Sequence, residues 1–273
     1  MSVTPHDFDY IKNLVFKHSA IVLDAGKEYL VSSRLNPVAK KAGVNSIGEL
    51  VSKLKASGSA GLLTEVIEAM TTNETSFFRD LHPFETLKSA VFPQLIQARR
   101  TVKSLRIWCG ASSSGQEPYT ISMVIKDNFP ELANWNIQIL CTDISQEMLD
   151  RTKNGEYSQL EVNRGLPITK LVKFFSQSGT QWKAKDDLRK FIHTQPLNLA
   201  GTWPSIGQFD LIFIRNVLIY FDSNTKKQIM AKVRSVLKPD GFFFLGATET
   251  TLNLDDKFER ITTGKTTYYR KLA

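Results

Sequence analysis

The sequence has few of the residues that several kinds of chemistry require. It contains only two cysteines, Cys109 and Cys141, among 273 residues. Both follow or interrupt apolar runs, so we expect reduced, packed thiols rather than a disulfide. The four histidines are His6, His18, His82 and His193. They are too scattered for the spacing of a metal site or a catalytic triad. The sequence therefore predicts neither a metal centre nor a nucleophilic cysteine.

Long hydrophobic runs are lacking too. No stretch reaches the roughly 18 to 20 apolar residues of a membrane-spanning helix. The first residues, MSVTPHDFDYIK, lack the basic and apolar regions of a secretory signal. We therefore expect a cytoplasmic protein without membrane insertion. Its length suffices for two ordinary domains.

The chain is basic, with a net charge of +8 and a pI near 9.4. Such a charge raises the possibility of a nucleic-acid partner. The first 80 residues are neutral, however, with nine Lys or Arg and nine Asp or Glu. Within them the basic residues gather between positions 27 and 55. This pattern fits either a solvated helix face or a docking surface for an acidic partner.

Residues 5–70 show only helical periodicity. Apolar residues recur at three- and four-residue spacing in HDFDYIKNLVFKHSA, KEYLVSSRLNPVAKKAG, SIGELVSKLKAS and GLLTEVIEAM. Ser46 and Glu49 have the spacing of a capping box at a helix start. Short turns join these segments, as in a small helical bundle. We expect a helical domain over residues 1–80.

After residue 100 the period changes. The runs LRIWCGA, IQILCTDIS, FDLIFIRNVLIYF and GFFFLGAT alternate with helical segments. They are typical of strands buried on both faces of a mostly parallel sheet. TTYYRK is expected to pair antiparallel with the last of them. These patterns predict a doubly wound, Rossmann-like α/β domain over residues 81–273, with an inserted small subdomain at about 155–194.

The loop CGASSSGQEPYT after the first strand argues against a phosphate ligand. Gly110 and Gly115 have the spacing of a phosphate-binding loop, but Gln116 and Glu117 replace its Lys and Ser/Thr. A carboxylate at a helix start repels phosphate oxygens, and the dinucleotide fingerprint is absent. A nucleotide-like ligand without phosphate fits the loop. S-adenosylmethionine has this chemistry, with an adenosine, a sulfonium and an amino-acid tail.

Polar residues at further strand ends support such a ligand. Asp143 in CTDIS stands where an acid accepts hydrogen bonds from ribose hydroxyls; the alternative is that it caps the helix near Ser145. The first loop and its spacing to Asp143 favour the ribose role. Asn198 and Leu199 end the strand-like HTQPLNL and are candidates to face the adenine.

Arg215 and Asn216 interrupt the apolar run of RNVLIYFD. Packing explains the apolar residues that follow, but buried polar groups need partners. A ligand lying across the strand ends would supply them.

The segment TTNETSFFRD, residues 71–80, links the two predicted domains. Asn73 and Thr75 offer hydrogen-bonding side chains, Phe77 and Phe78 can pack, and Arg79 carries a planar fork for carboxylates. The alternative is an N-capped helix, with Asn73 or Thr75 as the cap.

These motifs together resemble the chemotaxis receptor methyltransferases, the CheR family of bacteria. TTNETSFFRD, IWCGASSSGQEPYTISM, CTDIS, RNVLIYF and LKPDGFFFLGATE stand in the family's order and spacing over nearly the whole chain. The resemblance implies methyl transfer from S-adenosylmethionine to glutamate side chains of chemoreceptors. Glutamyl methyl esters and S-adenosylhomocysteine would be the products, and no metal would take part.

The resemblance also implies the site residues. Cofactor contacts would come from Asn73, Thr75, Arg79, Glu117, Asp143, Asn198, Leu199, Arg215 and Asn216. Arg79 and Tyr220 would act in catalysis, Tyr220 near the transferred methyl. Arg34, Lys40 and Lys41 would dock the acidic methylation helices of the receptor.

One departure concerns the inserted subdomain. FFSQSGTQWKAKDD is shorter and poorer in glycine than the hairpin with which some relatives bind a pentapeptide tether on the receptor. We therefore favour an enzyme that works without the tether.

Three other functions compete with this interpretation. An RNA methyltransferase would suit the basic pI, but no module of stacked aromatic and basic residues is evident. Arg79 and Tyr220 argue against a cofactor-binding sensor without activity. A dehydrogenase lacks its pyrophosphate fingerprint.

Overall fold

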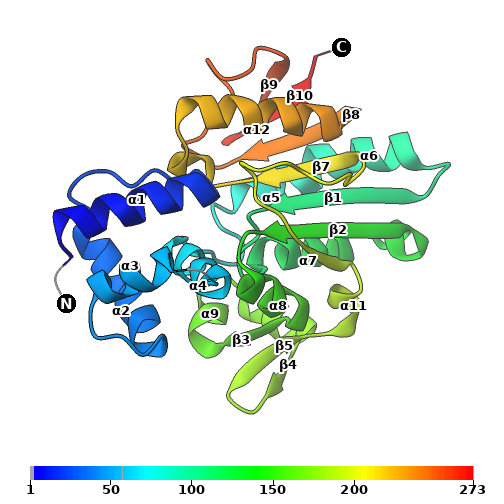
Figure 1. The fold of residues 1–273 in the computed structure, drawn as a ribbon. Helices are drawn as coiled ribbons and strands as arrows, with labels where there is room; N and C mark the ends of the chain where they lie inside the picture. The colour runs from blue at the N-terminus through cyan, green and yellow to red at the C-terminus, as the bar shows by residue number, and fades with distance from the viewer. Residues whose placement is uncertain (1–2, 57, 273) are drawn as a thin grey trace. The chain divides into compact units, whose positions relative to one another are not determined.

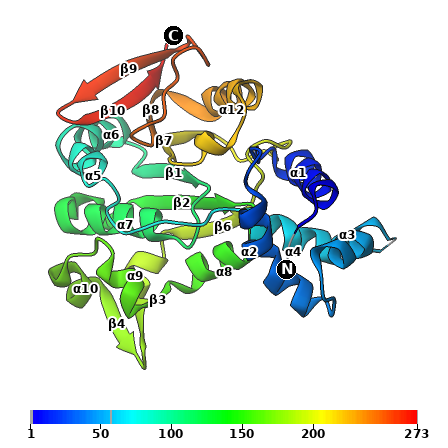
Figure 2. The same cartoon turned by 90° about the vertical axis from the view of Figure 1, so that its left-hand side faces the viewer.

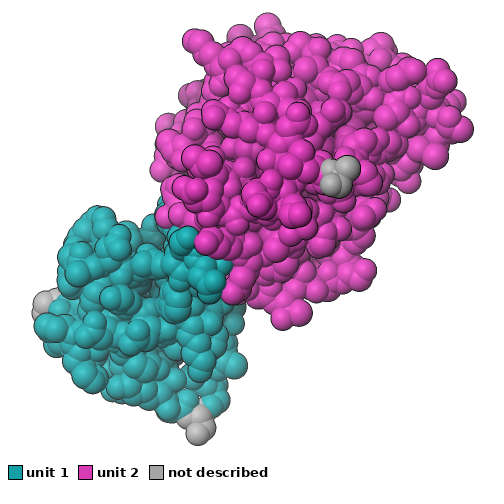
Figure 3. Space-filling view, turned by 90° about the horizontal axis from the view of Figure 1, so that it is seen from above, with its two compact units in different colours: residues 1–72, 220–225 teal, residues 73–219, 226–273 magenta. Residues whose placement is uncertain are grey.

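A computed structural model describes residues 3–56 and 58–272. The chain forms two compact units, coloured separately in Figure 3. The first comprises Met1–Thr72 and Tyr220–Thr225, and the second comprises Asn73–Ile219 and Lys226–Ala273. The sequence placed the division after residue 80. The segment 73–80 is counted with the second unit because its contacts are there.

In the described part of the helical unit there are four helices, α1 (Pro5–Ser19), α2 (Glu28–Lys41), α3 (Ile47–Lys55) and α4 (Ala60–Met70). Thr4 and Ser46 cap α1 and α3 through their side-chain oxygens. Glu49 bonds the backbone N–H of Asn45, so the capping pair closes one residue earlier than a standard box. The later segment 220–225 joins this unit through a β-bridge between Ile21 and Phe221.

The second unit is built on a seven-stranded sheet in the order β6-β2-β1-β7-β8-β10-β9 (Figure 1). Its strands are β1 (Ser104–Gly110), β2 (Asn136–Asp143), β6 (Ile192–Pro196), β7 (Phe209–Ile214), β8 (Leu237–Leu245), β9 (Phe258–Thr263) and β10 (Thr266–Lys271). The five from β6 to β8 are parallel, whereas β10 pairs antiparallel with β8 and β9. The strand order reverses between β1 and β7, the point at which doubly wound folds bind ligands.

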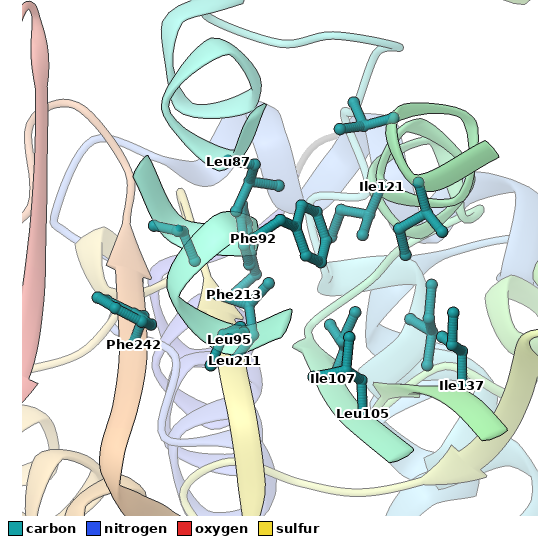
Figure 4. Close-up of a cluster of buried hydrophobic side chains, with 14 of the residues drawn as sticks. Leu87, Phe92, Leu95, Leu105, Ile107, Ile121, Ile137, Leu211, Phe213 and Phe242 are labelled. Carbon is teal, nitrogen blue, oxygen red and sulfur yellow. The ribbon is translucent and has the colours of Figure 1, made fainter. Parts of the chain in front are cut away.

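Helices cover both faces of this sheet (Figure 2). One face carries α5 (His82–Thr86), the π-helix η1 (Leu87–Val91), α6 (Phe92–Arg99), α7 (Gln116–Asn128) and the short 3-10 helix η2 (Pro130–Asn134). The other carries α12 (Ser223–Val236), while α8 (Gln146–Asn154) packs beside β2 and β6 and accepts a hydrogen bond from Tyr119 of α7 at the carbonyl of Thr152. Side chains such as Leu87, Phe92 and Ile121 pack on Ile107 and Phe213 of the sheet, and this core fixes the strand ends (Figure 4).

The segment that interrupts the alternation forms its own small sheet, in the order β3-β5-β4. It contains β3 (Glu156–Ser158), α9 (Gln159–Asn163), α10 (Ile168–Phe174), β4 (Phe175–Ser178), β5 (Gln181–Ala184) and α11 (Asp186–Arg189). Its core includes Tyr157 and Phe175, which pack around Phe77 from the front motif.

Two local features differ from the sequence-based expectation, and a third agrees with it. The apolar run FDLIFIRNVLIYF is not one strand: β7 ends at Ile214, and the 3-10 helix η3 (Leu218–Tyr220) follows. The sequence analysis did not predict the edge strand β9, because most of its residues are polar and only Phe258 is buried. TTYYRK pairs antiparallel with β8, as predicted, and Tyr269 lies opposite Phe243 in this pairing. Within the described residues, no helix has the length and apolar character to span a membrane.

Candidate functional site

The loop from Gly110 to Gly115 leads from β1 into α7 in a strained conformation. Ala111, Ser113 and Gly115 have φ values of 54°, 50° and 93°. A Cβ atom on Gly115 would lie 2.9 Å from the side chain of Thr152, so glycine is required there on two grounds. Left-handed backbone at non-glycine residues is costly and gathers at functional sites. The loop therefore has the character of a ligand-binding turn.

Asp143, at the end of β2, holds this loop in place. One of its carboxylate oxygens accepts the backbone N–H of Ser113 at 2.8 Å, and the other accepts that of Ser145 at 3.0 Å. The helix α8 is capped by Ser145 itself, whose hydroxyl accepts the N–H of Met148. The alternative, in which Asp143 caps α8, is therefore wrong, because Ser145 is the capping residue and Asp143 binds the backbone N–H of that residue. Its role toward a ribose stays a prediction.

Arg215 is buried and bonded within the protein. Its side chain is 2% exposed and donates to Glu117 at 2.8 Å and to Asp80 at 2.7 Å. It also donates to the backbone carbonyl of Arg79 at 3.1 Å. We expected a ligand to satisfy this residue, but the start of α7 and the front segment supply its main partners. That argument for a ligand was wrong for Arg215, which joins three parts of the site.

Glu117 is the acid at the start of α7. Burial raises its pKa above the usual value, and the charges of Arg215 and Arg79 oppose that rise. Removing one partner of a buried ion pair leaves an uncompensated charge, so the two groups hold each other in place. The carboxylate therefore belongs to a fixed ion pair at the mouth of the first loop, and a phosphate group would be repelled there.

Asn216 follows Arg215 in a left-handed conformation with φ of 60°. The carboxylate of Glu249 accepts backbone N–H groups from Asn216, Val217, Leu218 and Gly246 at 2.7 to 2.9 Å. This carboxylate fixes the turn after β7 against the end of β8. Sequence reasoning missed Glu249, although it is the only acid in GFFFLGATET.

Two buried polar atoms at these strand ends have no hydrogen-bond partner in the described structure. They are the hydroxyl oxygen of Ser112 and the side-chain carbonyl oxygen of Asn216. The Nε atom of Arg215 is also unpaired. Buried polar groups are rarely left unsatisfied. A ligand with hydroxyl and amino groups would satisfy the two oxygens, so the residues fit an aminoacyl-nucleoside such as S-adenosylmethionine.

Asn198 and Leu199 lie just beyond β6, beside Asp143. The carbonyl of Asp143 accepts the N–H of Leu197, which sets the start of this loop. The side-chain oxygen of Asn198 accepts the N–H of Ala200 at 3.0 Å. Leu199 is buried. The structure thus brings both residues to the same edge of the sheet as Asp143, and their contact with adenine stays a prediction.

The front motif is not a helix. Residues 73–76 have no regular structure, residues 77–80 form a turn, and α5 begins only at His82 without a side-chain cap. The helical alternative is therefore wrong, while Phe77 is fully buried. Asp80 at φ of 66° repeats the strain of the first loop. The hydroxyl of Ser113 donates to the carbonyl of Asn73 at 2.7 Å and ties the motif to that loop.

Arg79 and Thr75 lie in the same segment, each partly exposed. One terminal nitrogen of Arg79 donates to the carbonyl of Glu74 at 3.1 Å. No ion pair with a carboxylate is found for Arg79 among residues 3–56 and 58–272. Its backbone carbonyl accepts a hydrogen bond from Arg215, which pairs with Glu117, so the residue lies beside the start of α7.

Tyr220 lies in η3 and is counted with the helical unit. Its carbonyl accepts the N–H of Val22 at 2.9 Å. Its role near a methyl group stays a prediction.

The expected docking residues differ among themselves. Arg34 is half-buried and donates to the carbonyls of Met70 and Thr71 and to the hydroxyl of Thr72. It closes the end of α4, and burial lowers its pKa. Lys40 and Lys41 are exposed. Lys41 pairs with Glu65 at 3.1 Å, so of these two lysines only Lys40 has no acidic partner in the described structure.

The two cysteines lie inside the fold. Cys109 and Cys141 are free, fully buried thiols whose pKa values burial raises. In the part of the chain that the structure describes, no three His, Cys, Asp or Glu side chains gather as a metal site.

The doubly wound sheet has a strained loop at its switch point, and the carboxylate of Glu117 in that region disfavours phosphate. These features define an α/β enzyme that binds a nucleoside cofactor without phosphates, the class to which S-adenosylmethionine-dependent methyltransferases belong.

Two family models match the chain. Residues 6–71 match the all-alpha domain of the CheR methyltransferases, and residues 73–267 match their S-adenosylmethionine-binding domain. A "Chemotaxis protein methyltransferase 1" of Pseudomonas aeruginosa is 42% identical over 275 residues, covering 99% of each chain. "Chemotaxis protein methyltransferase Cher2" of Pseudomonas putida is 42% identical, covering 96% of each chain. A counterpart in Vibrio cholerae is 37% identical, covering 95% of each.

The chain belongs to the CheR family of chemotaxis methyltransferases. The family resemblance inferred from the motifs is confirmed, as is the order of a helical domain followed by a methyltransferase domain. S-adenosylmethionine is the cofactor that its larger domain binds.

Proposed function

We propose that the protein methylates glutamate side chains of chemoreceptors. The observation that carries this proposal is Arg79, a cation without a carboxylate partner in the described structure, whose backbone carbonyl accepts a hydrogen bond from the guanidinium of Arg215, the partner of Glu117. A guanidinium fork at that position suits an incoming carboxylate.

The chemistry needs no general base. A glutamate carboxylate has an unperturbed pKa near ~4.3 and is already an anionic nucleophile at neutral pH. S-adenosylmethionine, when bound, would supply an electrophilic methyl group for the carboxylate oxygen, with the sulfonium sulfur as the leaving group that keeps the electron pair. No proton moves in this step. The protein's task is alignment, which supplies on the order of 7 to 11 kcal/mol in favourable systems.

The residues divide this task. Asp143 and the loop it holds would bind the ribose, and Asn198 with Leu199 would border the adenine. Glu117, Arg215 and Asn216 would surround the aminoacyl end, together with Asn73 and Thr75. Arg79 would hold one carboxylate oxygen of the substrate and leave the other free, while Tyr220 would orient the methyl end. Lys40 and Lys41 would contact the acidic methylation helices of the receptor.

The test incubates the protein with methyl-labelled S-adenosylmethionine and cytoplasmic receptor fragments. Base treatment should release volatile labelled methanol, which identifies an ester. Replacing the methylated glutamates by glutamine should abolish the label. Transfer of base-stable label, or none at all, would contradict the proposal. Fragments with and without their C-terminal tails should be methylated alike if the tether is not used.

A further inference from the structure

The positive charge of the chain is concentrated near its end. Residues 226–273 contain ten Lys or Arg and five Asp or Glu, a net charge of +5 out of +8 for the whole chain. The cofactor site does not use this charge, since its cations are Arg79 and Arg215.

Some of these positively charged side chains are paired within the fold. Lys238 pairs with buried Asp210 at 2.9 Å, and Arg234 pairs with Asp255 at 3.0 Å. Lys232 donates to two backbone carbonyls. These contacts hold α12 and β8 in place and leave little for a partner.

Four other cations are exposed and lack an acidic partner in the described structure. They are Lys227, Lys257, Arg260 and Lys265, called the basic rim below. Arg260 makes one long contact, at 3.4 Å, to the hydroxyl of Thr267. The basic rim spans the start of α12, the loop before β9, β9 itself and the turn into β10.

The basic rim borders two adjoining hollows. The first, about 720 Å³, lies between α12 and residues 250–260 and is lined by Lys227, Lys257 and Arg260. Its wall also presents Leu252, which is 72% exposed, and one acid, Asp256, that has no ion pair in the structure as described. The hollow therefore combines positive charge with apolar surface.

The second hollow, about 280 Å³, shares Thr250 and Arg260 with the first. It adds Lys265 and reaches Arg215 and Glu249 of the candidate site. The basic rim thus leads along the sheet edge to the carboxyl ends of β7 and β8, where the cofactor site lies.

We propose that the basic rim and its two hollows dock an acidic segment of the protein substrate beside the glutamate that is methylated. This inference rests on the proposed function. Charge complementarity identifies the occupant as acidic, and Leu252 fits the apolar face of an amphipathic protein helix. An RNA strand fits less well, since in residues 73–272 no large aromatic side chain is exposed for stacking.

Docking of this kind acts mainly on the KM for the protein substrate. Exposed ion pairs each contribute little, and salt screens them. Several cations along one path nevertheless raise the encounter rate and hold the segment in register. Binding of the small cofactor and the rate of the transfer step should be unaffected.

The test compares K227E/K257E with the matched control R100E/K153E, which reverses two exposed charges elsewhere on the same unit. Initial rates are measured with a receptor cytoplasmic fragment at about 0.05 and 0.3 M salt. We expect the KM of K227E/K257E to rise about tenfold at low salt, with kcat within about twofold. The difference should shrink at high salt, and the control should behave as the wild type.

Several outcomes would overturn the inference. One is an unchanged KM in K227E/K257E, and another is an equal rise in the control. Tight binding of single-stranded RNA by the wild type, lost in K227E/K257E while the KM for receptor is unchanged, would assign the surface to RNA. Calorimetric binding of S-adenosylhomocysteine checks that both variants are folded. If the wild type forms no base-labile ester, the proposed function fails, and that result is separate from any change between the variants.

Discussion

The carboxylate of Glu249 accepts the backbone N–H of Asn216 at 2.7 Å, across the ends of two neighbouring strands. Asn216 has φ of 60° and an unpaired side-chain oxygen. Without an external acceptor, the turn would relax toward a conformation with negative φ, because left-handed backbone costs a non-glycine residue free energy. The pair shows how an acid outside the predicted site can set the geometry of a residue inside it.

Replacing Glu249 by glutamine should therefore weaken cofactor binding. The glutamine amide turns one acceptor into a donor that faces backbone N–H groups. We expect the Kd for S-adenosylhomocysteine to rise about tenfold and the free energy of unfolding to fall by about 3 to 6 kcal/mol, the worth of two hydrogen bonds to a charged group. Calorimetry and urea unfolding measure the two effects. Glu259→Gln, on exposed β9, is the control, and equal affinities in both variants would refute the positioning role.

Replacing Glu117 by glutamine should strain the buried pair with Arg215. Since Glu117 is 14% exposed and Arg215 keeps Asp80, we expect a loss of about 1 to 3 kcal/mol in the free energy of unfolding. The double variant E117Q/R215M should be less destabilised than the sum of the two single changes, and a thermodynamic cycle from urea unfolding measures this coupling. Strict additivity would mean that the two residues do not act together.

Replacing Arg79 by alanine should lower kcat for receptor methylation at least about 100-fold, because the guanidinium that would bind the substrate carboxylate is removed. Arg79→Lys keeps the charge without the planar fork and should lose about tenfold. The Kd for S-adenosylhomocysteine should stay within about threefold in both. Arg164→Ala, which removes an exposed partner of Glu74, is the control. Near-normal turnover in Arg79→Ala would disprove the role.

The buried thiols should make the protein less stable at alkaline pH. Burial raises the pKa of Cys109 and of Cys141, so the folded state keeps both protons where the unfolded chain, with a thiol pKa near ~8.5, releases them. The unfolded state then binds fewer protons, and the free energy of unfolding falls as pH rises above about 8.5.

The slope should approach about 1.4 kcal/mol per pH unit for each thiol. Urea unfolding between pH 7.5 and 9.5 measures it, and C109A/C141A should show a smaller slope. Neither native thiol should react with a disulfide reagent before unfolding. Fast reaction of either thiol in the folded protein would contradict this prediction.

The sequence allowed the architecture to be predicted where periodicity and strand ends carry it. The parallel strands, the helices between them and the positions of Asp143 and Glu117 follow from patterns a few residues long. The partner of Arg215 does not, since Glu117 is 98 residues away and Asp80 is 135 residues away. Both acids stand in the quoted motifs, but nothing local shows that they meet a buried arginine.

Glu249 and Arg34 illustrate two other limits. An acid in a loop is normally read as solvated, and only the folded chain gives Glu249 four backbone donors. Arg34 lies in a basic stretch of the sequence and was interpreted as a docking residue, whereas its guanidinium donates hydrogen bonds to residues at the end of α4. The charge pattern of the sequence therefore predicted that this region is basic, but not which of its side chains are free to contact a partner.

The return of residues 220–225 to the helical unit has a consequence for how this protein can evolve. The bridge between Ile21 and Phe221 makes the helical unit depend on two separate stretches of the gene. Recombination at one crossover near residue 72 would pair helices from one parent with a 220–225 stretch from another. Exchange of the helical unit between relatives should therefore require matched changes at both stretches, so the two should covary among homologues.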